Sequence, residues 1–189
     1  MRIIAGKLKG TALHITKNKN TRPLKDLVKE SIFNLLTHSN KISFKLEHSN
    51  ILDLYAGTGS FGLECLSRQA KCVYFIENEK STFQILEKNI EKLKIKKKAK
   101  IFFKDVFSLI KKQNISVSKF DLIFCDPPFK DTNIKKLIEL IFNKSLLKEN
   151  GIIILHRNKT TEEKLPNYFS ILDERIYGIS KIIFGKLLS

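Results

Sequence analysis

The sequence contains little cysteine, and its cysteines form no pattern. Only three occur among 189 residues, Cys65, Cys72 and Cys125, and no two of them have C-x-x-C spacing. The four histidines are also far apart along the chain. Zinc sites and disulfide frameworks need paired or clustered ligands, so we expect neither a bound metal nor a disulfide. Free thiols fit a reducing compartment, and we expect a cytoplasmic protein.

Long hydrophobic runs are missing as well. No stretch approaches the roughly 18 consecutive apolar residues of a membrane span, and residues 1–6 lack the apolar segment of a secretory signal. Hydrophobic residues still make up 42% of the chain, which is enough for a globular core. We therefore expect a soluble monomer without membrane attachment, built on one main domain.

Acidic residues are in the minority, since 35 Lys and Arg against 19 Asp and Glu give a net charge of +16. Excess positive charge favours polyanions such as nucleic acid. Compositional drift toward lysine, which supplies 30 of the 35 cations, is the alternative. Residues 1–50 carry 10 cations and 3 anions, residues 92–189 carry 21 and 10, but residues 51–91 carry 4 and 6. Uniform drift would not leave one segment acidic.

Residues 1–45 form a distinct N-terminal part. Two short extended segments, 2–5 and 11–15, precede a helical pattern that starts near Thr21, with Thr21 as the N-cap and Pro23 in the first turn. The polar stretch 40–50 is typical of a linker. We therefore divide the chain into an N-terminal extension, residues 1–45, and a main domain, residues 46–189.

Apolar runs alternate with helical patterns from residue 51 onward. The runs predict strands at 51–55, 72–76, 101–103, 120–125 and 151–155, and the stretches between them predict helices at 61–68, 81–93, 106–112 and 133–147. Strands without polar alternation, separated by helices, indicate a parallel sheet that is covered on both faces. Residues 168–187, with Gly178 at the turn, predict a closing antiparallel hairpin. The predicted fold is α/β and Rossmann-like.

A glycine-rich loop, Asp53-Leu54-Tyr55-Ala56-Gly57-Thr58-Gly59-Ser60-Phe61-Gly62, joins the first of these strands to a helix. Its three glycines fit the pattern G-x-G-x-x-G, which lets a backbone approach a ligand closely at a helix N-terminus. Glu77 ends the second strand and is placed to bind ribose hydroxyls. This is the dinucleotide fingerprint, and read literally it predicts an oxidoreductase that binds NAD.

Asp53 favours a different cofactor. Its carboxylate would lie close to a dinucleotide pyrophosphate, and like charges at short range are costly in a dry crevice. The cationic methionyl end of S-adenosylmethionine would instead be attracted. Glu77 would still bind the ribose, and Asp105 is placed for the adenine amino group, unless it only caps the next helix. The predicted cofactor-binding residues are Asp53, Tyr55, Ala56, Gly57, Thr58, Gly59, Gly62, Glu77 and Asp105.

Asp126-Pro127-Pro128-Phe129 ends the fourth strand, at the edge where open α/β sheets bind ligands. The Asp126 carboxylate and the proline carbonyls accept hydrogen bonds, a combination that suits the exocyclic NH2 of a nucleobase. Phe129 would stack on the base, a contact worth ~1–3 kcal/mol. The base must reach such a pocket unstacked. These four residues are the predicted catalytic site; a rigid turn with local capping by Asp126 is the alternative.

Together the motifs resemble the bacterial RsmD family, which consists of 16S ribosomal RNA guanine-N2 methyltransferases. The resemblance runs from about residue 2 to the closing hairpin. Besides the two motifs it includes Thr21-Arg22-Pro23, Lys29 to Asn34, Gly62-Leu63-Glu64, Leu66-Ser67-Arg68, Ile76-Glu77 and Lys88-Asn89. Leu24 and Lys29 depart from the family, which usually has Thr and Arg there. Lysine in place of arginine gives up a bidentate phosphate contact.

The resemblance implies a seven-stranded sheet of order 3-2-1-4-5-7-6 and a short N-terminal β-hairpin that helps to bind RNA. It implies S-adenosylmethionine as cofactor, S-adenosylhomocysteine as product, and N2 of guanine 966 of 16S ribosomal RNA, in an assembling small subunit, as target. The candidate RNA-binding residues are Lys7, Lys9, Arg22 and Lys25, and the lysine run at 92–100 is either a further candidate or a solvated helix end. A noncatalytic RNA-binding or assembly protein would need only the charge and is the remaining alternative.

Overall fold

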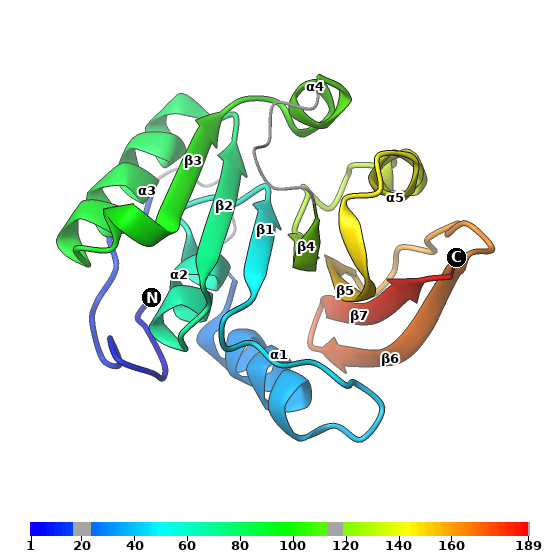
Figure 1. Ribbon diagram of the computed structural model, residues 1–189, viewed down its shortest axis with the longest axis horizontal. Coiled ribbons are helices and arrows are strands. Elements are labelled where there is room, and N and C mark those ends of the chain that lie inside the picture. Colours follow the sequence, from blue (N-terminus) through cyan, green and yellow to red (C-terminus); the bar gives the residue numbers. More distant parts are fainter. Residues whose placement is uncertain (17–23, 113–118, 189) are drawn as a thin grey trace.

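A computed structural model describes residues 1–16, 24–112 and 119–188 of the chain (Figure 1). Its elements, in chain order, are α1 (Asp26–His38), β1 (Asn50–Leu54), α2 (Ser60–Ser67), β2 (Cys72–Glu77), α3 (Lys80–Lys92), a 3-10 turn η1 (Lys96–Lys98), β3 (Ala99–Phe103), α4 (Val106–Lys111), β4 (Phe120–Cys125), α5 (Ile134–Asn143), β5 (Leu147–Asn158), β6 (Phe169–Tyr177) and β7 (Ser180–Leu187).

The strands form one seven-stranded sheet in the order β3-β2-β1-β4-β5-β7-β6. The pairs from β3 to β5 are parallel, and β7 runs antiparallel to both β5 and β6. This confirms the predicted fold class, the strand order and the closing hairpin. The chain crosses from β3 at one edge back to β4 beside β1, so the carboxyl ends of β1 and β4 flank a topological switch point, where ligands bind in such sheets.

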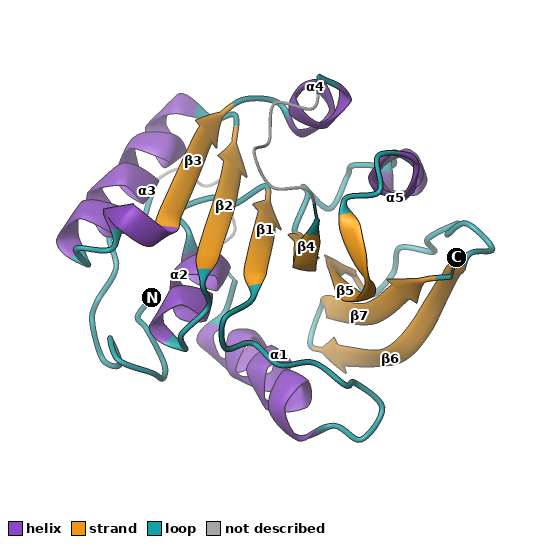
Figure 2. Cartoon of the chain, in the orientation of Figure 1, coloured by secondary structure: helices purple, strands orange, loops and turns teal. Residues whose placement is uncertain are grey.

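Helices cover both faces of the sheet (Figure 2). Residues of α1, α2 and α3 pack into one apolar core on one face, and residues of α4 and α5 pack into a second core on the other. A central strand contributes to both, because successive side chains point to opposite faces: Ile51 of β1 lies in the first core and Leu52 in the second. That explains why the central strands show no polar alternation.

The N-terminal extension shares the first core with the main domain. Ile3, Leu13 and Ile42 are buried in the same cluster as Phe61 of α2. The predicted β-hairpin is reduced to a turn with a single antiparallel bridge, between Arg2 and Ala12. The extension is therefore packed onto the main domain and is not a free appendage.

Two helix boundaries differ from the prediction. The first helix begins at Asp26 after Lys25, whose side chain makes no capping hydrogen bond, and the predicted cap Thr21 and Pro23 lie outside the described residues. The predicted helix 133–147 stops at Asn143. Ser145 adopts a left-handed backbone with φ of 50°, which turns the chain into β5.

No helix in the described ranges has the length and hydropathy needed to cross a membrane. Within the same residues, no group of His, Cys, Asp and Glu is arranged to hold a metal ion. The three cysteines are free thiols.

Candidate functional site

The two predicted motifs meet in one cavity of about 710 Å³ at the carboxyl ends of β1 and β4. Leu54 of β1 pairs with Cys125 of β4, so the residues that follow these two strands emerge side by side. The cavity is lined by most of the predicted site residues: Asp53, Tyr55, Ala56, Gly57, Thr58, Glu77, Asp126, Pro127, Pro128 and Phe129. Of the predicted cofactor residues, Gly59, Gly62 and Asp105 are not among those that line it.

The glycines shape the loop around this cavity. Gly57 and Gly59 have φ angles of 59° and 89°, a left-handed backbone that favours glycine. At Gly62 a Cβ atom would come within 2.3 Å of the Phe75 ring, so only glycine lets α2 pack this close to β2. Gly59 and Gly62 therefore act through the backbone path of the loop.

Asp53 is a buried carboxylate at the floor of the cavity. Its Oδ2 accepts a hydrogen bond from the Gly62 N–H at 3.0 Å. Burial raises its pKa well above the usual range, the Gly62 hydrogen bond opposes this, and the charges of Asp126 and Glu77 raise the pKa further. Three carboxyl groups that repel one another around one cavity favour a cationic ligand.

Glu77 is held in place by the backbone. Its Oε2 accepts from the Gly57 N–H at 2.8 Å, and its Oε1 accepts from the N–H groups of Asn78 and Glu79 at 2.9 and 2.7 Å. Each carboxylate oxygen has two lone pairs, so a ligand hydroxyl can still donate to this group. The carboxylate is preorganised for the ribose contact that the sequence predicts.

Asp105 caps the helix that follows it, which is the alternative role predicted from the sequence. It is exposed, and its Oδ1 accepts from the Ser108 N–H at 2.8 Å as the N-cap of α4. Its contact with an adenine amino group remains a prediction.

Arg157 supports the loop that carries Asp126 to Phe129. The arginine is fully buried, its guanidinium pairs with Glu163, and it donates to the carbonyls of Pro128, at 3.2 Å, and Asp131. The Pro128 carbonyl also accepts from the Asp131 N–H at 2.8 Å. That carbonyl is therefore engaged within the protein, although both prolines line the cavity.

His156, which the sequence reasoning missed, also lines the cavity. Its Nδ1 lies 2.8 Å from Asp126 Oδ1, its Nε2 lies 2.9 Å from Ser180 Oγ, and its ring meets Phe129 edge-on with centroids 5.4 Å apart. In the structure Cys125 of β4 pairs with Leu155 of β5, so the residues that follow them, Asp126 and His156, lie side by side. The sequence prediction missed His156 because the apolar run ends at Leu155, whereas β5 continues to Asn158.

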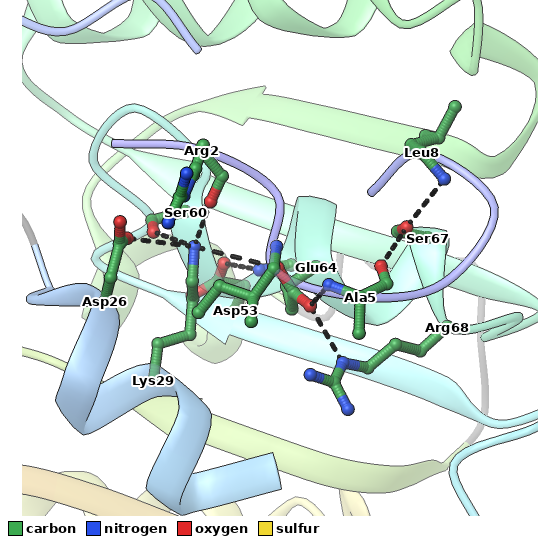
Figure 3. A network of polar contacts seen from close by, with 12 residues as sticks. Arg2, Ala5, Leu8, Asp26, Lys29, Asp53, Ser60, Glu64, Ser67 and Arg68 are labelled. Carbon is green, nitrogen blue, oxygen red and sulfur yellow. Dashed lines mark hydrogen bonds and ion pairs between the residues drawn. The ribbon is translucent and has the colours of Figure 1, made fainter. Parts of the chain in front are cut away.

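Lys29 and Glu64 form a buried polar cluster that fastens the N-terminal extension to α2 (Figure 3). Glu64 accepts from the N–H groups of Ile4 and Ala5 at 2.7 and 2.9 Å and from Arg68 Nε at 2.8 Å. Its Oε2 lies 3.7 Å from Lys29 Nζ.

Lys29 is fully buried, and its Nζ donates to the Arg2 carbonyl at 2.8 Å. Burial lowers the pKa of Lys29, while the charges of Glu64 and Asp26 oppose that shift. The amine therefore makes structural contacts within the protein.

The extension also reaches the cavity. Ile15, Thr16 and Leu24 line its mouth. Asn89 of α3 accepts from the His14 N–H at 2.7 Å and donates to the carbonyl of Thr58 in the glycine loop at 3.0 Å. Asn89 thus links the N-terminal segment to the glycine loop through two hydrogen bonds.

The RNA-binding candidates fall into two groups. Lys7, Lys9 and Lys25 are exposed, whereas Arg22 lies outside the described residues. The exposed turn Lys96–Lys98 precedes β3, whose first residue Ala99 pairs with Val73 near the start of β2. This part of the lysine run therefore lies at the amino end of the parallel strands, opposite the cavity.

Comparisons with known proteins agree with this architecture. A family model described as Conserved hypothetical protein 95 matches residues 1–186. Ribosomal RNA small subunit methyltransferase D of Haemophilus influenzae is 34% identical over 180 residues, which cover 95% of this chain and 90% of that protein.

Among solved structures, a Haemophilus influenzae protein superposes with a TM-score of 0.79 at 31% identity, covering 100% of this chain and 98% of the other. An RNA methyltransferase of Salinibacter ruber, crystallised with S-adenosylhomocysteine, has a TM-score of 0.66 at 11% identity, covering 89% and 95% of the two chains. The fold of the chain is that of class I methyltransferases.

Proposed function

Because the chain belongs to the family described as Conserved hypothetical protein 95, we propose that it is an S-adenosylmethionine-dependent methyltransferase of ribosomal RNA. The proposed target is the exocyclic N2 of a guanine in 16S ribosomal RNA, guanine 966 by the resemblance, in a small-subunit assembly particle. One observation carries the proposal: the glycine loop, the carboxylates of Asp53 and Glu77 and the Asp-Pro-Pro-Phe motif line the same cavity.

The residues present fit this cofactor. Asp53 would face its cationic methionyl end, which relieves the repulsion from Asp126 and Glu77. Glu77 would bind the ribose hydroxyls, and the left-handed backbone at Gly57 allows close approach. A dinucleotide fits less well, because its pyrophosphate would meet the same carboxylates.

Asp126 and the Pro127 carbonyl would hold the two protons of the base amine. Bound there, the amine has its lone pair directed into the cavity, and Phe129 packs on the base. When bound, S-adenosylmethionine supplies an electrophilic methyl group, which moves to nitrogen while the electrons of the broken C–S bond stay on sulfur. The methylated nitrogen then loses one proton to solvent water, and no strong base is needed because the cationic nitrogen is acidic. Most of the rate enhancement comes from positioning.

We also propose that the N-terminal extension, residues 1–45, contacts the RNA and that residues 46–189 form the methyltransferase domain. Exposed Lys7, Lys9 and Lys25 supply positive charge on the extension, and Arg22 is a further candidate. The extension borders the cavity at Ile15 and Leu24, so RNA held there would present a flipped base to Asp126.

The test is transfer of labelled methyl groups to naked 16S RNA, to partly assembled small subunits and to intact subunits.

Asp126→Asn should lower kcat at least about 100-fold, because the amine is no longer oriented. S-adenosylmethionine affinity, measured by calorimetry, should change less than about twofold. Asp121→Asn, at the other end of β4, is the matched control and should stay active. Wild-type activity in Asp126→Asn would refute the assignment of Asp126, and RNA binding without methyl transfer by the wild-type protein would indicate a noncatalytic role.

A further inference from the structure

His156 is a polar side chain of the cavity that the proposed mechanism does not use. It is 7% exposed, and its ring lies between Asp126 on one side and Ser180 of β7 on the other. The three residues come from the end of β4, from β5 and from the start of β7, which are neighbours in the sheet. The Ser180 hydroxyl, the His156 imidazole and the Asp126 carboxylate therefore contact one another in sequence, and Asp126 lies at the predicted base site.

The two ring nitrogens have different partners, and this defines the tautomer. A carboxylate can only accept, so the approach of Asp126 Oδ1 to within 2.8 Å favours the proton on Nδ1. In a neutral ring Nε2 is then an acceptor, and the Ser180 hydroxyl at 2.9 Å donates to it. Ser180 is itself buried, which keeps water from competing for this bond.

The contact between Asp126 and His156 is close without being aligned. Nδ1 is within ion-pair distance of Oδ1, yet it has no well-directed hydrogen bond among the described residues. A buried donor without an aligned acceptor destabilises the fold, because it has lost its hydrogen bonds to water. A small rotation of either side chain would align the bond, and catalytic hydrogen bonds commonly tighten only when the substrate is bound.

On these grounds, and resting on the function proposed above, we propose that His156 is a positioning residue that orients the Asp126 carboxylate toward the base amine, with Ser180 fixing the imidazole tautomer. Oδ1 of Asp126 is the atom held by His156, which leaves Oδ2 to accept from the amine. Phe129 packs against the edge of the same ring, so the imidazole also supports the stacking surface.

The first test is made on the protein alone by nitrogen NMR of its histidines. The wild-type His156 ring should carry its proton on Nδ1, and Asp126→Asn or Ser180→Ala should shift the ring toward the Nε2–H form. An Nε2–H ring in the wild-type protein would overturn the proposal. This measurement does not depend on methyl transfer, so it separates a failure of the positioning role from a failure of the proposed enzymatic function.

The second test uses His156→Phe, which keeps the ring but removes both nitrogens, and His156→Asn, whose amide can donate from a position near that of Nδ1. His156→Phe should lower kcat at least about tenfold, leave KM for RNA within about twofold and leave S-adenosylmethionine affinity unchanged. His156→Asn should recover most of kcat. His38→Phe, at the exposed end of α1, is the matched control.

Each other outcome contradicts the proposal. Wild-type kcat in His156→Phe would show that Asp126 needs no support. A rise in KM with kcat unchanged would show that His156 binds the base directly. His156→Asn as inactive as His156→Phe, with both variants folded by thermal denaturation, would show that the imidazole acts in another way.

Discussion

At the residue scale, Asp53 is subject to opposing demands from stability and from ligand binding. Its carboxylate is buried beside Asp126 and Glu77, and its pKa is raised. A raised pKa in the folded state means that this group stabilises the fold below the unfolded pKa of about 3.9 and that this stabilisation is lost as pH rises through the folded pKa. At neutral pH the residue therefore lowers the stability of the ligand-free protein.

Asp53→Asn should remove this cost. Without cofactor, the variant should be more stable than the wild type at pH 7, and the difference should shrink toward pH 4, because the wild-type carboxyl is then protonated in the folded state and about half protonated in the unfolded state. Affinity for S-adenosylmethionine should fall at least about tenfold, since a charge pair is removed. Thermal denaturation at both pH values and calorimetry provide the two measurements. A variant that is less stable at pH 7 than the wild type would contradict this account of Asp53.

At the element scale, α2 holds both the glycine loop at its start and the N-terminal extension along its side. Glu64 makes the second connection through Ile4, Ala5 and Lys29 (Figure 3). Ser67 adds to it, because its Oγ accepts from the Leu8 N–H at 3.0 Å and its carbonyl accepts from the Lys7 N–H at 2.9 Å. The buried face of α2 is polar at Glu64 and Ser67 because these side chains accept hydrogen bonds from backbone N–H groups of the extension.

Glu64→Gln tests that connection. The amide keeps the shape but offers one acceptor where two are used, and it leaves the Lys29 charge without its buried partner. Breaking a buried pair in this way costs about 3–5 kcal/mol, so the free energy of unfolding in urea should drop by that order. Glu87→Gln removes the same charge from the exposed face of α3 and should change stability by less than about 0.5 kcal/mol. Equal effects of the two changes would exclude the proposed fastening.

The sequence predicted the elements from β1 to β4 well, because each of these strands is an apolar run that is followed by a helical pattern. β4 was predicted with its observed ends, Phe120 and Cys125. The prediction failed for polar residues whose positions depend on tertiary contacts. His156 and Arg157 continue β5 beyond its apolar run, and Lys29 is buried by partners 27 and 35 positions away, Arg2 and Glu64. Spacing along the chain carries no signal for such contacts.

At the scale of the whole molecule, a chain with a net charge of +16 has a cavity lined by four carboxylates, those of Asp53, Glu77, Glu79 and Asp126, and by one lysine, Lys130. Positive charge occurs both on the N-terminal extension, where Lys7 packs beside Ser67 at the carboxyl end of α2, and on η1, which precedes β3. These two places allow a controlled comparison, because equal numbers of lysines can be removed from each.

Replacing Lys7, Lys9 and Lys25 with Gln should weaken RNA binding and reduce the slope of log affinity against log salt by about 0.7 for each phosphate that is no longer neutralised. The control replaces Lys96, Lys97 and Lys98, which changes the net charge equally at the end of the sheet away from the cavity. Binding titrations at several salt concentrations give both slopes. If the slope falls equally in the two triple variants, the N-terminal extension has no special part in holding RNA.

The attachment of the first residues to α2 also affects synthesis of the chain. Ile4 binds Glu64, 60 positions later, and His14 binds Asn89, 75 positions later. At roughly 5–20 residues per second, the ribosome needs about 3–15 s to supply these partners. During that time Ile3 and Leu13, which are buried in the finished protein, have no core to enter. These residues therefore cannot take their final places until α2 and α3 have been synthesised.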